Sequence, residues 1–323
     1  MPETIVVLDP IAEERLVRMR ALLPEGFVLE RGKSREEADQ LAAIRMGGYA
    51  ITGDVPVTAA MMRAGAETGL RAVQKWGVGF DNIDLDAARQ NGVRVMRTTG
   101  SNAKAVAETT LAMMMALQRS LVVGHMMLLR GEWGKAAVGP TTFLLSGKTV
   151  GLVGLGYIGK EVARMLKLFG CRVLYTKPTP LPADEAAELG AEHVDFATLI
   201  AESDIVSLHC LLTEATRNLI GPAEIAAMKD GVLIINTARG GIVDEAALLA
   251  ALKSGKVRGA GLDVFEIEPA GTDNPLVGLD NVIVTPHIGA QAADTFARNV
   301  TRMFANIAAV AEGRDPPAID VLV

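Results

Sequence analysis

The sequence predicts an α/β protein of two domains from its length, its aliphatic composition and its alternation of strand-like with helix-like segments. The chain has 323 residues, and roughly 150 residues per domain is a reasonable prior. Hydrophobic residues make up 50% of the chain and aromatic residues only 4%. That bias is typical of buried parallel sheets, whose strands are rich in Val, Ile and Leu. A disordered chain is excluded, because it would lack the apolar material that offsets the entropy of ordering.

Charge and cysteine content exclude several other classes of protein. The chain carries 32 Lys and Arg against 38 Asp and Glu, and no basic run marks a nucleic-acid-binding surface. Two cysteines, Cys171 and Cys210, cannot form a disulfide scaffold. The apolar stretches at residues 111–117 and 121–129 fall short of the roughly 20 residues that span a bilayer. We therefore expect a cytoplasmic protein without nucleic-acid, membrane or metal-ion partners, whose first residues form a strand rather than a signal peptide.

The first hundred residues predict one small α/β unit. Strands are expected at residues 5–8, 27–29, 49–52, 72–74 and 93–96, and helices at 11–22, 35–46, 58–66 and 84–90. Short apolar runs that alternate with helical periodicity are the pattern of βαβ units, which build parallel sheets.

The rest of the chain predicts a second unit and a returning helix. A methionine-rich helical stretch at residues 103–129 breaks near 118–120, and a loop is expected at 131–146. Methionine more often fills core or interface space than it binds a cofactor. Strands then follow at 149–153, 172–175, 205–208, 232–236, 259–263 and 282–285, and a last helix at 290–312. If that helix packs on the first unit, the domains are 1–102 with 290–323, and 103–289.

A glycine-rich turn is the first chemical signal. The run is Gly154-Leu155-Gly156-Tyr157-Ile158-Gly159, between a predicted strand and a predicted helix. In that context the first glycine permits the turn, the second lets a pyrophosphate approach, and the third packs the helix on the strand. Amides at the start of the helix then face the phosphates. A merely tight turn is the weaker alternative.

The end of the following strand bears on the choice of cofactor. NAD sites place an acidic residue about 20 positions after the glycines to bind the ribose hydroxyls. Here the chain reads Thr176-Lys177-Pro178, and no carboxylate appears before Asp184. A cation suits a 2′-phosphate, so Lys177 favours NADP over NAD, although a solvated loop lysine is the alternative.

Three later segments place an arginine, a carboxylate and a histidine after neighbouring strands, at the edge where open α/β sheets bind ligands. These are Arg239, Glu268 and His287. Histidine is the natural proton donor near neutral pH, and a carboxylate beside it favours the imidazolium. Arginine can bind a substrate carboxylate through two parallel hydrogen bonds. Each residue alone has an ordinary structural explanation, but together they predict a catalytic site beside the cofactor.

Together, these motifs make the chain resemble the D-isomer-specific 2-hydroxyacid dehydrogenases over nearly its whole length. The resemblance rests on the glycine turn and on further segments: Lys75-Trp76-Gly77-Val78-Gly79-Phe80-Asp81-Asn82-Ile83-Asp84, Asn102-Ala103-Lys104-Ala105-Val106-Ala107-Glu108, Asn236-Thr237-Ala238-Arg239-Gly240-Gly241, Asp263-Val264-Phe265 and Pro286-His287-Ile288-Gly289. It implies a Rossmann dinucleotide-binding domain inserted into a flavodoxin-like substrate domain. The helix and loop after Ala103 match the arm through which such enzymes form homodimers.

The resemblance also implies roles for individual residues. Arg239, Glu268 and His287 match the catalytic residues of the family, and Lys75, Gly77, Val78 and Arg239 its substrate-binding residues. The cofactor-binding set is Val106, Gly154, Gly156, Tyr157, Ile158, Gly159, Lys177, Thr213, Thr237, Ala238, Asp263 and His287.

The expected reaction is hydride transfer between NADPH or NADH and a small 2-keto acid, most simply glyoxylate or hydroxypyruvate. Two alternatives remain: a phosphoglycerate dehydrogenase and a non-catalytic NAD(H)-sensing corepressor-like binding protein. The family's phosphoglycerate enzymes tend to carry an arginine where this chain has Ile51-Thr52-Gly53-Asp54, and Asp54 would repel a phosphate. Trp76 stands at a position that is usually smaller and lines or crowds the substrate pocket.

Overall fold

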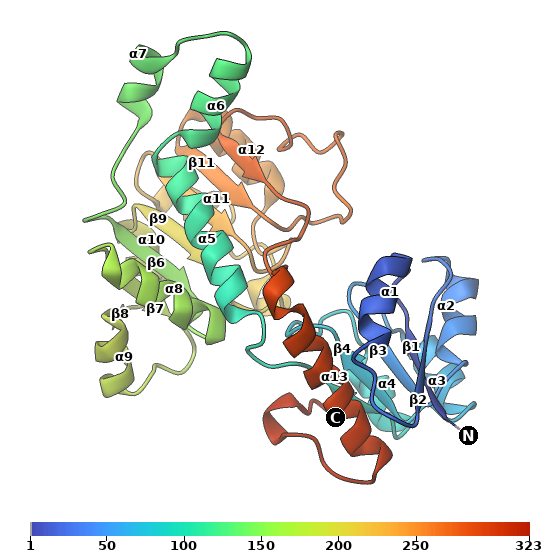
Figure 1. Ribbon diagram of the computed structural model, residues 1–323. Helices are drawn as coiled ribbons and strands as arrows, with labels where there is room; N and C mark the ends of the chain where they lie inside the picture. Colours follow the sequence, from blue (N-terminus) through green and yellow to red (C-terminus); the bar gives the residue numbers. More distant parts are fainter. Residues whose placement is uncertain (1) are drawn as a thin grey trace. The chain divides into compact units, whose positions relative to one another are not determined.

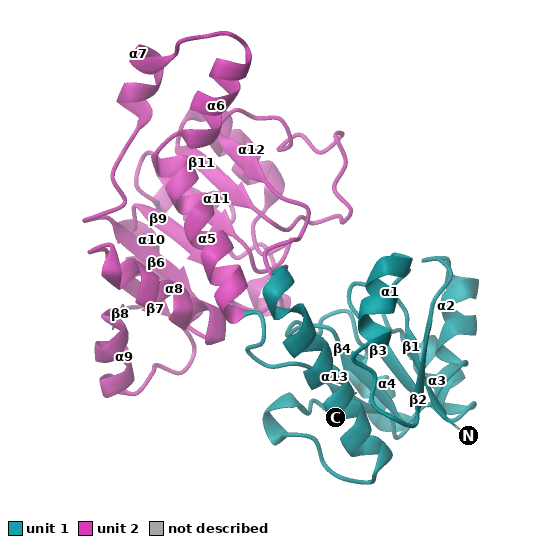
Figure 2. Cartoon of the chain, in the orientation of Figure 1, with its two compact units in different colours: residues 1–102, 292–323 teal, residues 103–291 magenta. Residues whose placement is uncertain are grey.

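The computed structural model describes residues 2–323 and divides into two compact units (Figures 1 and 2). One unit holds the residues up to Asn102 together with Ala292–Val323, and the other is Ala103–Gln291. The chain therefore leaves the first unit once and returns to it with its last helix. The return falls two residues later than the sequence places it.

The first unit is a five-stranded parallel sheet covered by helices on both faces. Its elements are β1 (Glu3–Val7), α1 (Glu13–Arg20), β2 (Phe27–Arg31), α2 (Glu37–Ile44), β3 (Tyr49–Thr52), α3 (Ala59–Ala66), β4 (Ala72–Lys75), α4 (Leu85–Gln90), β5 (Arg94–Met96) and α13 (Phe296–Ala311). The strand order β2-β1-β3-β4-β5 is that of flavodoxin-like folds. Successive side chains of β1 enter opposite cores: Ile5 packs with α1 and α13, and Val6 with α2, α3 and α4.

The second unit is a seven-stranded parallel sheet in Rossmann order. Its strands are β6 (Thr149–Val153), β7 (Arg172–Thr176), β8 (Ala191–His193), β9 (Ile205–Leu208), β10 (Val232–Asn236), β11 (Val257–Leu262) and β12 (Val282–Val284). Apart from α6 and α7, described below, its α-helices are α5 (Ala103–Gln118), α8 (Tyr157–Leu168), α9 (Ala183–Leu189), α10 (Phe196–Glu202), α11 (Pro222–Ala227) and α12 (Glu245–Ser254). The order β12-β11-β10-β9-β6-β7-β8 reverses direction beside β6, the switch point at which doubly wound sheets bind dinucleotides. The predicted fold class is confirmed.

A segment rich in apolar residues, called the arm below, follows α5. It comprises α6 (Leu121–Leu129), α7 (Lys135–Val138) and a 3-10 turn at Gly139–Thr141. No single helix within residues 2–323 is long and apolar enough to cross a membrane. The pair α5 and α6 reaches that length only across a 64° bend, and α5 packs against α8, β10 and β11.

The structure corrects three details of the predicted elements. The expected loop at residues 131–146 contains α7 and the 3-10 turn. The three-residue strand β8 is absent from the prediction, because Ala191-Glu192-His193 contains none of the β-branched or aromatic residues that favour strands. The last helix begins at Phe296 rather than at 290: a 3-10 turn at Ala293–Thr295 precedes it, and hydrogen bonds to Asp263 hold Ile288 and Gly289 in the loop before that turn.

Candidate active site

Most of the predicted cofactor residues follow strands of one sheet and therefore share its carboxyl edge. The glycine turn follows β6, Lys177 follows β7, Thr237 follows β10, Asp263 follows β11 and His287 follows β12. All seven strands are parallel, so their carboxyl ends point the same way. This is the edge at which open α/β sheets bind ligands.

The turn between β6 and α8 has the shape that a pyrophosphate needs. Gly154 has φ +96°, and a Cβ there would lie 2.8 Å from the Cys210 nitrogen. A Cβ at Gly159 would lie 2.6 Å from the Gly154 carbonyl oxygen. At Gly156, immediately before α8, no atom lies within 4 Å of such a Cβ. The turn is thus crowded where helix meets strand and open where the helix amides are exposed, so these residues fit a dinucleotide.

The other residues proposed for the adenosine and pyrophosphate side lie around this turn. Tyr157 and Ile158 are the first two residues of α8. Lys177 is half-buried directly after β7. Thr213 precedes a short 3-10 helix, and its amide donates to the Thr216 hydroxyl at 2.8 Å. Their contacts with a cofactor stay predictions.

A pair of buried threonines ties α5 to the end of β10. The Thr110 hydroxyl donates to the Val106 carbonyl at 2.8 Å and lies 2.8 Å from the Thr237 hydroxyl. Val106, Thr110 and Thr237 are all buried. Thr110 is absent from the predicted set, because a threonine inside a helix gives no sequence signal for such a contact.

Arg239 lies in a turn that Asn236 shapes. The Asn236 side chain accepts a hydrogen bond from the Ala238 amide at 3.1 Å and donates to the Arg239 carbonyl at 2.8 Å. The next residue, Gly240, is so close to Phe265 that a Cβ would lie 1.8 Å from the Phe265 carbonyl oxygen. Glycine is therefore required there, and it brings the Arg239 turn against the segment that carries Glu268.

Glu268 and His287 form the central contact of the site. The Nδ1–H of His287 donates to Oε2 of Glu268 at 2.7 Å, and the Phe265 amide donates to Oε1 at 3.0 Å. Burial would raise the pKa of Glu268, but the hydrogen bond and charge of His287, the Phe265 amide and the charge of Arg239 together hold this pKa below its usual range. The carboxylate is therefore ionised at neutral pH.

Asp263 holds the loop that carries His287. Its Oδ1 accepts from the Thr285 hydroxyl at 2.6 Å and the Ile288 amide at 2.8 Å, and its Oδ2 accepts from the Gly289 amide at 2.8 Å. Its carbonyl accepts from the His287 amide at 2.9 Å. These bonds hold His287 at φ +52°, in the left-handed region. Asp263 also stays a predicted cofactor residue, but the structure gives its carboxylate a second role that its position in the motif does not reveal.

The predicted substrate loop belongs to the other unit, directly after β4. The Lys75 ammonium donates to the Gly53 carbonyl and, at 3.0 Å, to Oδ1 of Asn82. Gly77 has φ +120°, and no atom lies within 4 Å of the place a Cβ would take. The space on that side of Gly77 is therefore open, while Lys75 helps to hold the end of β3 in place. Binding of substrate by Lys75, Gly77 and Val78 stays a prediction.

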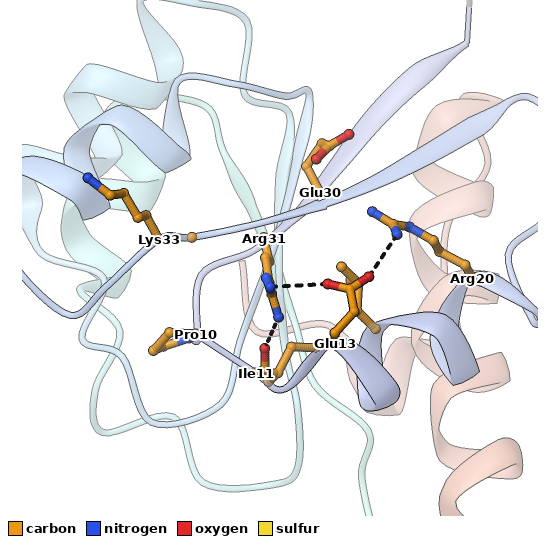
Figure 3. A pocket seen from close by; sticks show the side chains of 9 residues that line it. Pro10, Ile11, Glu13, Arg20, Glu30, Arg31 and Lys33 are labelled. Atoms are coloured by element: carbon orange, nitrogen blue, oxygen red, sulfur yellow. Dashed lines mark hydrogen bonds and ion pairs between the residues drawn. The ribbon is translucent and has the colours of Figure 1, made fainter.

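A shallow polar pocket elsewhere on the first unit does not coincide with the predicted site. It encloses about 560 Å³ beside β2 and α1 (Figure 3). Glu13 pairs there with both Arg20, at 3.4 Å, and Arg31, at 3.1 Å. Since its arginines already have a carboxylate partner, this pocket carries no argument for function.

Comparison with known proteins identifies the family. Residues 111–289 match the family model for the D-isomer specific 2-hydroxyacid dehydrogenase NAD binding domain. A hydroxypyruvate reductase of Thermotoga maritima is 40% identical over 296 residues, which are 90% of this chain and 93% of that protein. A D-3-phosphoglycerate dehydrogenase of Archaeoglobus fulgidus is 40% identical over 292 residues, but the match covers only 54% of its length.

Solved structures of related enzymes show the same similarity. The crystal structure of a glyoxylate reductase from Paecilomyes thermophila has a TM-score of 0.84 and 30% identity, covering 99% of this chain and 98% of that one. The similarity therefore extends over both units.

Proposed function

The chain belongs to the D-isomer-specific 2-hydroxyacid dehydrogenases, and from that premise we propose that it reduces a small 2-keto acid of the glyoxylate or hydroxypyruvate type, with His287 as the general acid. The observation that carries the proposal is the 2.7 Å hydrogen bond between His287 and the ionised Glu268. It holds the ring through Nδ1, and we assign the proton transfer to the other ring nitrogen, Nε2.

Each residue of the proposed site has its own role in the reaction. A nicotinamide cofactor, when bound, supplies or takes up the hydride. Arg239 binds the substrate carboxylate and polarises its carbonyl. The Nε2–H of His287 delivers the proton to the carbonyl oxygen, and in the reverse direction Nε2 accepts it from the hydroxyl. Glu268 stabilises the imidazolium throughout. The amides of Gly77 and Val78, with Lys75, contribute to holding the substrate carboxylate.

Replacement of His287 tests the mechanism. We expect His287→Ala to lower kcat for glyoxylate or hydroxypyruvate reduction by about 10²- to 10⁴-fold, the usual contribution of a general acid. The affinity for the reduced cofactor, measured by fluorescence titration, should change little. His193→Ala is the matched control, because His193 is an exposed residue of β8, outside both the predicted site and the arm. Near-normal turnover by the His287 variant would refute the assignment.

A substrate panel separates the proposal from its alternatives. It comprises glyoxylate, hydroxypyruvate, pyruvate, phenylpyruvate and phosphohydroxypyruvate, each with NADH and NADPH. We expect phosphohydroxypyruvate to be poor, because Asp54 is exposed after β3 where it would repel a phosphate. Efficient use of phosphohydroxypyruvate would favour a phosphoglycerate dehydrogenase instead.

We infer a preference for NADPH from Lys177. This cation follows β7, where NAD sites place a carboxylate, and the next acidic residue, Asp184, lies in α9. We expect Lys177→Asp to weaken NADPH binding about tenfold or more, through loss of a charge-assisted hydrogen bond and gain of repulsion, and to spare NADH. Lys167→Asp, on the surface of α8, is the control for charge alone. Equal affinities of the wild type for both cofactors would contradict the inference.

We also infer a homodimer formed through the arm. Leu128, Leu129 and Trp133 are 59%, 68% and 82% exposed. Large apolar side chains gathered on one projecting segment are typical of an interaction surface.

A further inference from the structure

A histidine that the proposed mechanism does not use lies beside the glycine turn of the second unit. His209 directly follows β9, and β9 is paired with β6 in the sheet (Figure 1). The His209 amide donates to the Val153 carbonyl at 2.8 Å. A Cβ at Gly154 would lie 2.8 Å from the carbonyl oxygen of His209. His209 is therefore packed against the start of the turn that fits a pyrophosphate, at the switch point of the sheet.

One nitrogen of the His209 ring is held by a buried hydroxyl. Its Nε2 lies 2.9 Å from Oγ of Ser207, a fully buried residue of β9. Within residues 2–323 the Ser207 side chain has no other hydrogen-bond partner. A buried hydroxyl hydrogen without an acceptor is costly, and Nε2 is the acceptor within reach. Ser207 is therefore the donor of this bond, and Nε2 accepts.

The other ring nitrogen of His209 is then a hydrogen-bond donor. Burial lowers the pKa of His209 to about 4, so the ring is neutral at pH 7. A neutral imidazole carries one proton, and with Nε2 as the acceptor that proton is on Nδ1. In the part of the chain that the structure describes, Nδ1 forms no hydrogen bond and is not buried from solvent. A fixed N–H donor thus lies open beside the glycine turn.

We propose that His209 is a cofactor-binding residue whose Nδ1–H donates a hydrogen bond to a pyrophosphate oxygen of the dinucleotide, and that Ser207 is the positioning residue that keeps the proton on Nδ1. This inference rests on the cofactor of the proposed function and not on its keto acid. The amides at the start of α8 favour an anion from the side of β6, and His209 adds a donor from the neighbouring strand. A hydrogen bond to a charged oxygen is stronger than one between neutral groups, so a single N–H affects affinity measurably.

Binding of nucleotide fragments tests the assignment. AMP, ADP and ADP-ribose share the adenosine half of the cofactor, but only ADP and ADP-ribose contain a pyrophosphate. Their affinities are measured by displacement of fluorescent NADH, which has no 2′-phosphate for Lys177 to bind. We expect His209→Phe to weaken NADH, ADP-ribose and ADP by about tenfold or more, the range of a hydrogen bond to a charged group. AMP should stay within about twofold.

Three further variants separate the lost donor from a disturbed fold. His209→Asn, whose amide N–H can take the place of Nδ1–H, should retain most of the affinity for ADP. Ser207→Ala combined with His209→Phe should show the same loss as His209→Phe, because exchanging both partners for apolar groups leaves no buried group unsatisfied. His193→Phe is the matched control at an exposed residue of β8 and should keep all four affinities.

Nitrogen NMR tests the position of the proton without any turnover. The chain has four histidines, so His209→Asn identifies the ring signals of His209 in protein that carries the heavy nitrogen isotope in histidine. At pH 7 we expect a protonated Nδ1 and an unprotonated Nε2, and a shift of the Nδ1 signal when ADP is added. Ser207→Ala should remove the preference for this tautomer and weaken ADP by a smaller factor than His209→Phe does.

Four results would overturn the inference while leaving the proposed function intact. They are a proton on Nε2 instead of Nδ1, an affinity for ADP that His209→Phe leaves unchanged, equal losses for AMP and ADP, and a loss confined to ADP-ribose and NADH. The last result would assign the donor to the second ribose. If no 2-keto acid is reduced but His209→Phe still weakens ADP and NADH, the proposed function fails and the inference stands.

Discussion

Glu268 is restrained from two sides before any substrate arrives. The Phe265 amide binds one carboxylate oxygen at 3.0 Å and His287 the other at 2.7 Å. The lowered pKa of Glu268 means that folding is stabilised by its ionised form. That contribution is complete above the ordinary value near 4.5 and is lost as the pH falls through the lowered value. By the same linkage, the carboxylate favours the protonated form of His287.

The pH profile of reduction tests this coupling at the residue scale. Reduction needs a protonated His287, so its rate falls as the pH rises through the titration of the imidazolium. We expect Glu268→Gln to move this alkaline limb to lower pH, because a neutral amide does not stabilise the cation, and to lower kcat at neutral pH. The measurement is kcat/KM for the keto acid from pH 5 to 10. Glu266→Gln, an exposed neighbour, should leave the limb in place; an unchanged profile in Glu268→Gln would refute the coupling.

At the scale of elements, Asp320 connects the C-terminal tail to the last helix and to the segment after β5. Its carboxylate is fully buried and receives Nε and Nη2 of Arg302, on α13, at 2.9 and 2.7 Å. It also accepts from the Thr99 amide at 2.9 Å and from the Asn306 side chain at 3.3 Å. One buried charge therefore ties the tail and the last helix to a segment that lies 221 positions earlier in the chain.

Removing that carboxylate should destabilise the protein strongly. We expect Asp320→Ala to lower the free energy of unfolding by about 3 kcal/mol or more, because the buried Thr99 amide and Asn306 side chain lose an acceptor and Arg302 loses its charge partner. Urea denaturation followed by circular dichroism measures the change. Asp315→Ala is the control: Asp315 pairs with Arg94 at 2.6 Å but is 82% exposed, and such pairs contribute about 0–1 kcal/mol. Equal effects of the two substitutions would contradict the role given to Asp320.

At the scale of the whole molecule, the apolar arm predicts the state of association. We expect sedimentation velocity to give twice the mass of one chain for the wild type. The double substitution Leu129→Asp and Trp133→Ser should shift the protein toward the single chain, because charge and polarity replace exposed apolar area. Leu168→Asp is a control outside the arm, at a residue that is 88% exposed. A wild-type protein with the mass of one chain would contradict the homodimer.

Much of this molecule could be predicted from local patterns in the chain. The alternation of strands and helices, the glycine turn at Gly154 and the positions of Arg239, Glu268 and His287 after strands all follow from short-range rules. These rules work because side-chain periodicity and glycine conformations depend on neighbouring residues. The exceptions are β8, whose residues Ala191-Glu192-His193 include none that favour strands, and the late start of α13, which a loop and a 3-10 turn precede.

The sequence by itself determined the fold class, the family resemblance and the kinds of side chain available for chemistry. Only the tertiary structure decided which atoms meet: Nδ1 of His287 with Glu268, the carboxylate of Asp263 with the loop at Ile288 and Gly289, and Arg15 with the ring of Trp76. Each of these contacts joins residues from 19 to 61 positions apart. Such contacts depend on how whole elements pack, because the order of strands and the facing of helices bring distant residues together, and no local pattern encodes that arrangement.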